Sequence, residues 1–278
     1  LVKRGHTLHF LFDPRLSALD VHDAFDEFLK EAPHTTWEYM KTRGVFSEYV
    51  VTAERELRSY RRYLVMPKQS DYYRRRWKKY LPFFFRVVLR VPGIHALLRT
   101  HAPGVFFEKA EGALLPPASV YTHMVSLKAD LLIAAPMNMR FSREVEYVKA
   151  ARLLGVRSVT PIFSWDNLTT KGVMHVIPDR VLVWNRTQEY EAVVYNSIQK
   201  DSVRVTGALL FDKWFLSRPV LSRETFCRTY GLNSTKPFIL YLGSSRNIAH
   251  DETWLIENLR EALIVGGLSH MQIVVRPH

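Results

Sequence analysis

The sequence predicts an α/β protein with two domains, each built on a parallel β-sheet. From about residue 129 onward, apolar runs of strand length alternate with helical patterns, as expected for strands joined by crossover helices. The alternation stops between residues 207 and 220 and then resumes, and 278 residues are enough for two modest domains. We therefore expect an N-terminal domain over residues 1–207 and a partial second domain over 208–278. The chain stops just past a strand, so we expect that second domain to be truncated at its C-terminus.

Four apolar segments are expected to form the sheet of the first domain. The first, residues 129–136, is apolar throughout, which is typical of a strand covered on both faces. The others span residues 156–163, 179–185 and 202–207. Helical patterns separate these segments, so we expect parallel pairing between the strands.

Two helices of the first domain carry recognisable end signals. Ser142 is expected to be the N-cap of a helix that ends at Gly155. One face of that helix holds the stripe Tyr147, Ala150, Ala151 and Leu154. Asn185 is expected to cap the next helix, with Gln188 three residues later in the capping-box position.

The second domain is expected to open with a strand–helix–strand unit. Strands are predicted over residues 238–245 and 271–276. The helix between them is expected to begin near Asp251. One of its faces would hold Trp254, Leu255, Asn258, Leu259, Ala262 and Leu263. This spacing is that of a βαβ unit, whose two strands are parallel.

The N-terminal third is less regular than the rest of the chain. A strand is predicted over residues 7–12 and an amphipathic helix over residues 16–32. A basic segment over residues 55–100 is expected to be helical.

The most basic part of that segment, residues 55–90, predicts an anionic partner. It holds twelve Lys or Arg against only Glu56 and Asp71, and the whole chain has a net charge of +12. Tyrosines, Trp77 and three Phe lie among these charges, which suits anionic lipid headgroups with apolar insertion, or stacked bases. No nucleic-acid-binding motif is present, so we expect an anionic membrane surface rather than nucleic acid. A solvated charged face is the open alternative.

The cysteine and histidine content argues against a metal centre. Cys227 is the only cysteine, which excludes an intramolecular disulfide and a Cys-based zinc site and suits a reducing cytosol. It lies in a helical pattern, so we expect it to be buried. The 11 His residues include no His-x-x-x-His or His-Glu-x-x-His spacing. We therefore expect no metal and no cofactor. The apolar runs are also too short for a transmembrane helix.

Polar side chains crowd the exit of the second predicted strand, in the motif SWDNLTTKG. They are Ser164, Asp166, Asn167, Thr169, Thr170 and Lys171. Ligands of parallel sheets bind beyond the carboxyl ends of the strands, so this loop is a candidate site. A carboxylate here could accept a proton from a substrate hydroxyl, and Lys171 or a threonine could hold a phosphate oxygen. The alternative is a turn stabilised by Asp166 and Asn167.

A second candidate site lies at the strand exits of the second domain. Gly243, Ser244 and Ser245 follow its first strand, where small residues let backbone N–H groups approach a phosphate. Arg276 and His278 follow its second strand, where Arg can bind a diphosphate and His can donate to it or act as acid or base. A plain loop between a strand and a helix is the open alternative.

Several motifs resemble those of GT-B type glycosyltransferases. They are SWDNLTTKG, PDRVLVWN, VTGALLFDKWF, ILYLGSS and VVRPH, together with RGH before the first strand. More narrowly, the motifs resemble a bacterial group related to the CDP-glycerol glycerophosphotransferases and surface-polysaccharide biosynthesis proteins. The resemblance rests on roughly residues 158–278 and implies two Rossmann-like domains. It also implies a transferase that moves a sugar or glycerol-phosphate group from a nucleotide-diphospho donor to a surface-glycan or lipid-linked acceptor.

The resemblance also implies roles for the candidate residues. Ser244, Ser245, Arg276 and His278, with Gly243, would hold the diphosphate of the donor. Asp166 and Asn167 would face the acceptor side, and Asp166 or His278 would be the catalytic base. Such an enzyme would be cytoplasmic and peripheral at the inner membrane face, and this stretch of chain could be inactive by itself.

Two other functions stay open at this point. A nucleotide-sugar 2-epimerase of the same architecture would use carboxylates around the sugar. A non-catalytic protein would instead bind membrane or nucleic acid through residues 55–90.

Overall fold

The computed structural model describes residues 1–15, 18–66, 71–246 and 248–278. All strand pairs in these ranges are parallel, which confirms the predicted α/β class with parallel sheets. The chain divides into two compact units, Leu1–Asp212 and Lys213–His278, which we call unit 1 and unit 2. The sequence predicts this division at residue 207.

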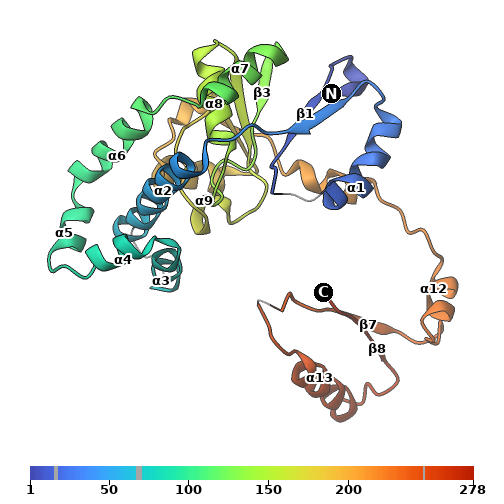
Figure 1. Ribbon diagram of the computed structural model, residues 1–278. Helices are drawn as coiled ribbons and strands as arrows, with labels where there is room; N and C mark the ends of the chain where they lie inside the picture. Colours follow the sequence, from blue (N-terminus) through green and yellow to red (C-terminus); the bar gives the residue numbers. More distant parts are fainter. Residues whose placement is uncertain (16–17, 67–70, 247) are drawn as a thin grey trace. The chain divides into compact units, whose positions relative to one another are not determined.

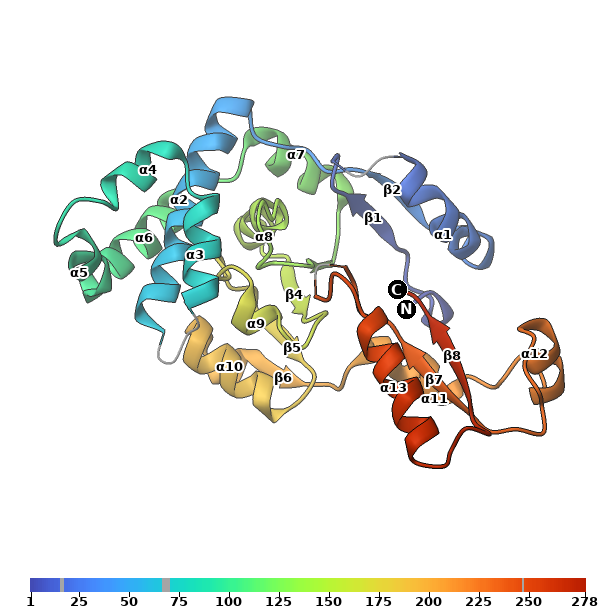
Figure 2. The ribbon, with the colours of Figure 1, turned by 90° about the horizontal axis from the view of Figure 1, so that it is seen from below.

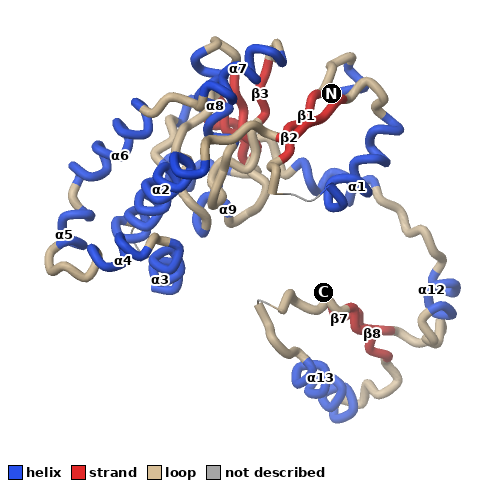
Figure 3. The backbone as a smooth tube through the Cα atoms, viewed as in Figure 1, coloured by secondary structure: helices blue, strands red, loops and turns tan. Residues whose placement is uncertain are grey.

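Unit 1 is organised around a four-stranded sheet (Figure 3). Its strands lie in chain order: β3 (Leu131–Ile133), β4 (Arg157–Pro161), β5 (Arg180–Val183) and β6 (Val203–Val205). All four strands fall inside the predicted segments. The prediction that the first strand is covered on both faces was wrong. β3 lies at the edge of the described sheet, and the side chains of Leu131 and Ile133 are 48% and 50% exposed.

Helices α8 (Glu144–Leu153), α9 (Asn167–Thr170) and α10 (Arg186–Asn196) connect these strands. Figure 2 shows α10 beside β5 and β6, which it contacts. Asn185 caps α10 as predicted, since its side chain accepts the N–H of Gln188 at 3.0 Å. The prediction for Ser142 was wrong, because Arg143 is the N-cap of α8 and the Ser142 hydroxyl donates to loop carbonyls before it.

Helix α8 is buried on two faces. Val145 and Val148 join the central core with residues of β5, α9 and α10. The predicted stripe of Tyr147, Ala150 and Ala151 packs instead against α7 (Ala118–Leu127). One helix therefore lies between two apolar clusters, which fixes its position relative to the sheet.

A second, two-stranded parallel sheet lies near the N-terminus. It pairs β1 (His9–Phe12) with β2 (Thr36–Tyr39), and α1 (Ala18–Glu31) connects the two strands. The core of this part is aromatic, with Phe10, Phe12, Phe25, Phe28 and Trp37 in edge and stacked contacts. The first two residues of the predicted helix, Leu16 and Ser17, lie outside the described residues.

Five helices form what we call the helical arm (Figure 1). They are α2 (Val45–Val65), α3 (Asp71–Tyr80), α4 (Phe83–Val88), α5 (Ile94–Arg99) and α6 (His101–Ala113). The arm has its own core of Tyr60, Tyr63, Leu64, Trp77, Leu81, Leu89 and Leu98. Lys68 of the predicted basic stretch lies outside the described residues. Within the described ranges, no helix is long and apolar enough to cross a membrane.

A buried ionic network joins the arm to α8. Arg55 of α2 contacts Glu111 of α6 at 2.7 Å and Glu146 of α8 at 2.6 Å. Lys149 of α8 reaches the same Glu111 at 2.5 Å, and Arg43 reaches Glu146 at 2.7 Å. Three separate segments thus share one set of charges that water does not screen.

Other arginines of α2 bind backbone carbonyls of unit 1. Arg58 donates to the carbonyl of His175 at 3.0 Å, and Arg61 donates to that of Thr100 at 2.8 Å. Arg62 is buried and donates to the carbonyls of Leu168, Lys171 and Gly172. The first four arginines of the basic stretch therefore bind groups within the protein. They do not belong to a solvated charged face, which was the alternative for this stretch.

Unit 2 contains the predicted βαβ unit. Strands β7 (Phe238–Leu242) and β8 (Gln272–Arg276) are parallel and flank α13 (Thr253–Val265). Leu259 and Leu263 of the predicted face of α13 are half-buried, together with Ile256, whereas Trp254 and Leu255 of that face are exposed. Cys227 of α12 (Arg223–Thr229) is 1% exposed, as predicted. The remaining short elements are η1 (Val2–Arg4), η2 (Lys200–Ser202), η3 (Leu209–Phe211) and α11 (Asp212–Leu216).

The ionic network predicts a large effect of Glu111→Gln. Burial would raise the pKa of Glu111, but Arg55 and Lys149 hold it well below its ordinary value, so the side chain is a carboxylate. The amide would leave Lys149 without its counter-charge and Arg55 with Glu146 alone, and we expect a loss of about 3–5 kcal/mol in the free energy of unfolding. Urea unfolding measures the loss. Glu108→Gln, at an exposed position of the same helix, is the control and should change stability by less than about 0.5 kcal/mol. Equal stability of the two variants would contradict the prediction.

Candidate functional site

A pocket in unit 1 lies beyond the carboxyl ends of three strands. Arg15 follows β1, Lys41 follows β2, and Arg140 to Arg143 follow β3. The opposite wall is one face of α2, which contributes Glu48, Thr52, Arg55, Glu56 and Ser59. The wider of two adjoining hollows measures about 560 Å³, a size suited to a small ligand. We call the two hollows together the arginine pocket.

The charged residues that line the arginine pocket are mainly basic. Its basic residues are Arg15, Lys41, Arg43, Arg55, Arg140 and Arg143, and its acidic residues are Glu48, Glu56 and Glu146. Carboxylates fix the guanidinium groups: Arg143 lies 2.8 Å from Asp13 and 2.7 Å from Glu48, and Arg15 also binds Asp13. Cations held in place in this way favour an anionic ligand.

Arg140 is held between two aromatic rings. Its guanidinium carbon lies 4.3 Å from the centre of the Tyr80 ring and 4.4 Å from that of Phe141. Its Nε donates to Oε1 of Glu56 at 2.9 Å. Stacking and the hydrogen bond fix the plane of the guanidinium, and the side chain is still 35% exposed and open to a ligand.

Glu56 has the properties of a general acid or base. The residue is 4% exposed, and its Oε2 atom has no hydrogen-bond partner. Burial raises the pKa of Glu56 to about 7, against the opposing effect of Arg140. Both protonation states are therefore populated near neutral pH, as efficient proton transfer requires. The sequence signal was present, because Glu56 is one of only two acids in the basic stretch, but no role was predicted for it.

Residues 164–172, the SWDNLTTKG motif, form what we call the SWDN loop, and several of its polar side chains form hydrogen bonds within the loop. Oδ1 of Asp166 accepts the Ser164 hydroxyl at 2.6 Å, and Oδ2 accepts the Thr170 hydroxyl at 2.7 Å. Lys171 lies 3.3 Å from the same Oδ2. The side chain of Asn167 accepts the backbone N–H of Ser164 at 2.7 Å. Thr169 donates only to the backbone carbonyl of residue 166.

These bonds bear directly on the predicted role of Asp166. Burial would raise its pKa, but hydrogen bonds from Ser164 and Thr170, with Lys171 nearby, hold the pKa below its ordinary value. Asp166 precedes α9 and its partners are those of a turn, which is the alternative left open by the sequence. The catalytic role of Asp166 stays a prediction.

The strand exits of unit 2 bring the predicted donor-binding residues together. The N–H of Gly243 donates to the carbonyl of Arg276 at 2.9 Å, and a Cβ atom on Gly243 would lie 3.5 Å from the backbone nitrogen of His278. Ser244 follows directly, and its N–H donates to Oε2 of Glu252 at 2.8 Å. The backbone carbonyl of Ser245 accepts two N–H groups of its own loop. Asn247 of this loop lies outside the described residues.

Glu252 occupies the place expected for a phosphate. Its carboxylate accepts the N–H of Ser244 and, at 2.8 Å, the hydroxyl of Tyr241. These bonds lower the pKa of Glu252, the hydroxyl of Tyr241 being the largest cause. A donor diphosphate would have to displace this carboxylate from the Ser244 N–H, and sequence reasoning did not foresee that competition.

A further cluster joins residues that no sequence spacing connects. His9, Glu38 and His123 come from β1, β2 and α7, and one ligating atom of each lies within 4.8 Å of those of the other two. The three residues lie far apart in the chain, so no local His spacing indicates the cluster.

Comparisons with known proteins leave the family open. No protein-family model matches the chain. No curated protein matches it either. Among solved structures, a glycosyltransferase from Rickettsia africae ESF-5 is 11% identical over 98% of this chain and 68% of that chain, with a TM-score of 0.37. A likeness at this score carries no argument, so the α/β class rests on the strand pairing of the chain itself.

The raised pKa of Glu56 predicts a pH-dependent stability. Because the folded value of about 7 lies above the ordinary 4.5, the stabilisation is complete below pH 4.5 and is lost as the pH rises through 7. The loss is on the order of 3 kcal/mol. We expect Glu56→Gln to remove this part of the pH dependence, so the stability of the variant relative to wild type should rise from pH 5 to pH 8. Urea unfolding at several pH values tests this, and a constant difference would contradict it.

Proposed function

We propose that the chain is part of a transferase that moves a sugar or glycerol-phosphate group from a nucleotide-diphospho donor to a surface-glycan or lipid-linked acceptor. The observation that carries the proposal is the contact between Arg140 and Glu56 in the arginine pocket. It joins a fixed cation to a carboxylate that can take up a proton near pH 7.

The acceptor is proposed to bind in the arginine pocket. Arg140, Arg143 and Arg15 would hold an anionic group of the acceptor, such as a phosphate. Tyr80 and Phe141 line the same hollow and would pack on the face of a sugar or glycerol unit.

In the proposed reaction, Glu56 is the base for the acceptor hydroxyl. The hydroxyl proton passes to Oε2 of Glu56 while the oxygen forms a bond to the transferred group. The bond from that group to the nucleotide phosphate breaks, and its electron pair leaves with the phosphate. In unit 2, Arg276, His278 and the N–H groups of Ser244 and Ser245 would bind a nucleotide diphosphate and offset its negative charge. Asp166 and His278 are alternative bases.

The sharpest test compares Glu56→Gln with Glu54→Gln. Burial raises the pKa of both carboxyls to about 7, but Glu54 does not line the pocket. With a nucleotide-diphospho donor and a phosphorylated glycan acceptor, we expect Glu56→Gln to lower kcat by about 10²–10⁴-fold and Glu54→Gln to leave it near wild type. Donor binding, measured by thermal shift with nucleoside diphosphates, should be unchanged in both variants.

Three other outcomes would change the proposed base, the type of reaction or the role of Arg276. A larger loss of kcat in Asp166→Asn than in Glu56→Gln would move the base to the SWDN loop. Donor consumption without any acceptor would favour the 2-epimerase. Donor binding that survives Arg276→Ala would remove Arg276 from its role.

Exposed aromatic residues in the arm favour a second function, which is docking to an anionic membrane. Phe83 and Phe84 are 71% and 69% exposed and lie beside the exposed Arg86 and Arg90. Rings flanked by cations suit insertion among anionic lipid headgroups. Such docking would place the enzyme at the inner face of the membrane, on the cytoplasmic side, close to a lipid-linked acceptor.

Sedimentation with liposomes tests this docking. We expect Phe83→Ser/Phe84→Ser to weaken binding to vesicles rich in phosphatidylserine by about tenfold or more, since each ring contributes about 1.5–3 kcal/mol when buried. Phe106→Ser, at another exposed position of the arm, is the matched control. Equal binding of the two variants would exclude α4 as the lipid-binding surface.

A further inference from the structure

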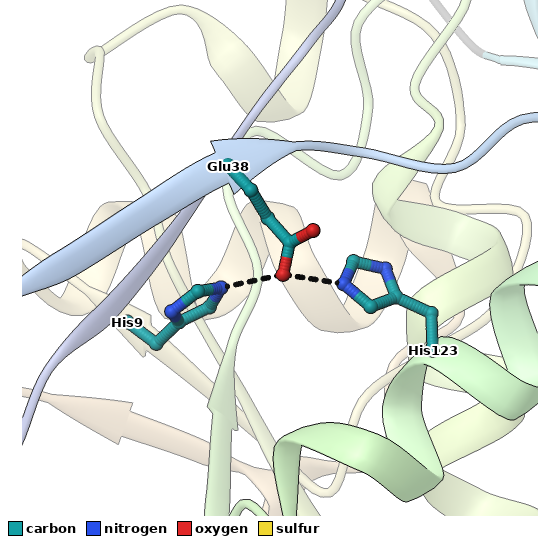
Figure 4. Close-up of side chains that lie close together, drawn as sticks. All are labelled: His9, Glu38 and His123. Atoms are coloured by element: carbon teal, nitrogen blue, oxygen red, sulfur yellow. Dashed lines mark hydrogen bonds and ion pairs between the residues drawn. The ribbon is translucent and has the colours of Figure 1, made fainter.

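His9 and His123 point toward the same carboxylate oxygen (Figure 4). The Nε2 atom of His9 lies 3.1 Å from Oε1 of Glu38, and the Nε2 atom of His123 lies 2.8 Å from it. Side chains from three separate elements thus bring two imidazole nitrogens and one carboxylate oxygen close together. Ligands of a tetrahedral Zn²⁺ at about 2.0–2.2 Å lie about 3.3 Å apart, which is close to the two N–O distances, and all three atoms lie within 4.8 Å of one another.

The other nitrogen of each ring is held by a hydroxyl group. Nδ1 of His9 lies 2.7 Å from Oγ1 of Thr36, and Nδ1 of His123 lies 2.8 Å from the hydroxyl of Tyr147. Tyr147 is itself fixed, since it accepts the backbone N–H of Lys41 at 2.8 Å. When Nδ1 donates to these oxygens, Nε2 of each ring carries a lone pair rather than a proton. Outer partners of this kind orient histidine ligands in metal sites.

The contact between His123 and Glu38 is not a satisfactory hydrogen bond. The side chain of His123 is 5% exposed, and its Nε2 atom has no hydrogen-bond partner although Glu38 is 2.8 Å away. The two atoms are close, but the direction is wrong for an N–H to donate. A buried nitrogen without a partner is costly, and a metal ion bound to its lone pair would remove that cost.

We propose that His9, Glu38 and His123 bind a divalent transition metal ion of the Zn²⁺ class. Two imidazole nitrogens and one carboxylate oxygen suit Zn²⁺ better than Mg²⁺ or Ca²⁺, which prefer oxygen ligands. His9 and Glu38 are 28% and 37% exposed, so the ion can enter from solvent and a water can complete the shell. Lys41 lies 3.7 Å from the other oxygen of Glu38 and leaves Oε1 to the ion.

The ion would join the two-stranded sheet to the rest of unit 1. Glu38 lies in β2 and His9 in β1, whereas His123 lies in α7, which packs on α8. None of the three residues lines the arginine pocket, although Lys41 contacts both the pocket and Glu38, so the two sites are adjacent but distinct.

Zinc titration of the whole chain tests the proposal. After treatment with a chelator, we expect isothermal titration calorimetry to show one Zn²⁺ per chain with a Kd of about 1 μM or lower at pH 7.5. Zinc should raise Tm, and Co²⁺ should give the visible absorption of a four-coordinate site. His9→Ala and Glu38→Gln should each weaken binding by about 100-fold or more. His34→Ala, at an exposed position outside the cluster, should bind as wild type does.

Thr36→Val supplies a second variant that keeps all three ligands. It removes only the hydroxyl beside His9, and we expect Zn²⁺ affinity to fall about 10–100-fold while the circular dichroism spectrum stays that of wild type. No Zn²⁺ binding by the wild-type chain would overturn the proposal, as would equal binding by wild type, His9→Ala and Glu38→Gln. Either result would leave Glu38 in polar contact with the two histidines and without a metal ion.

Discussion

The position of the helical arm depends on one buried carboxylate, Glu111. It receives Arg55 from α2 and Lys149 from α8, while Glu146 joins Arg55 to Arg43. Buried ion pairs contribute little net stability, because desolvation offsets most of the attraction, but they permit few alternative arrangements. The network therefore acts mainly to specify how the arm sits against the sheet.

That fixed position creates the chemistry of the arginine pocket. Helix α2 supplies one wall, so the burial of Glu56 and its raised pKa follow from where the arm lies. Arg140 comes from the exit of β3 on the other side, and its contact with Glu56 exists only because both walls are held. Two segments 84 residues apart in the chain thus make one candidate acid–base site.

The sequence predicted the features that depend on local patterns. Apolar runs located β3 to β6, and Asn185 with Gln188 located the start of α10, because strand burial and helix capping involve near neighbours. Long-range packing decided the rest. Contacts between distant segments bury Arg55 and Arg62 and determine the environment of Glu56. Such contacts also place His9 next to His123. The edge position of β3 could not be predicted for the same reason, since an apolar run does not show how many neighbouring strands a strand has.

Arg62 binds α9 and the loop after it through main-chain atoms only, namely the carbonyl of Leu168 in α9 and those of Lys171 and Gly172 in the loop. Every amino acid offers the same carbonyl, so this anchor does not depend on which side chains the loop displays. Gly172 is the exception, because a Cβ atom there would lie 3.1 Å from the carbonyl oxygen of Asn138 and from the hydroxyl of Ser59. The outward side chains of this loop can therefore change while the backbone keeps its path.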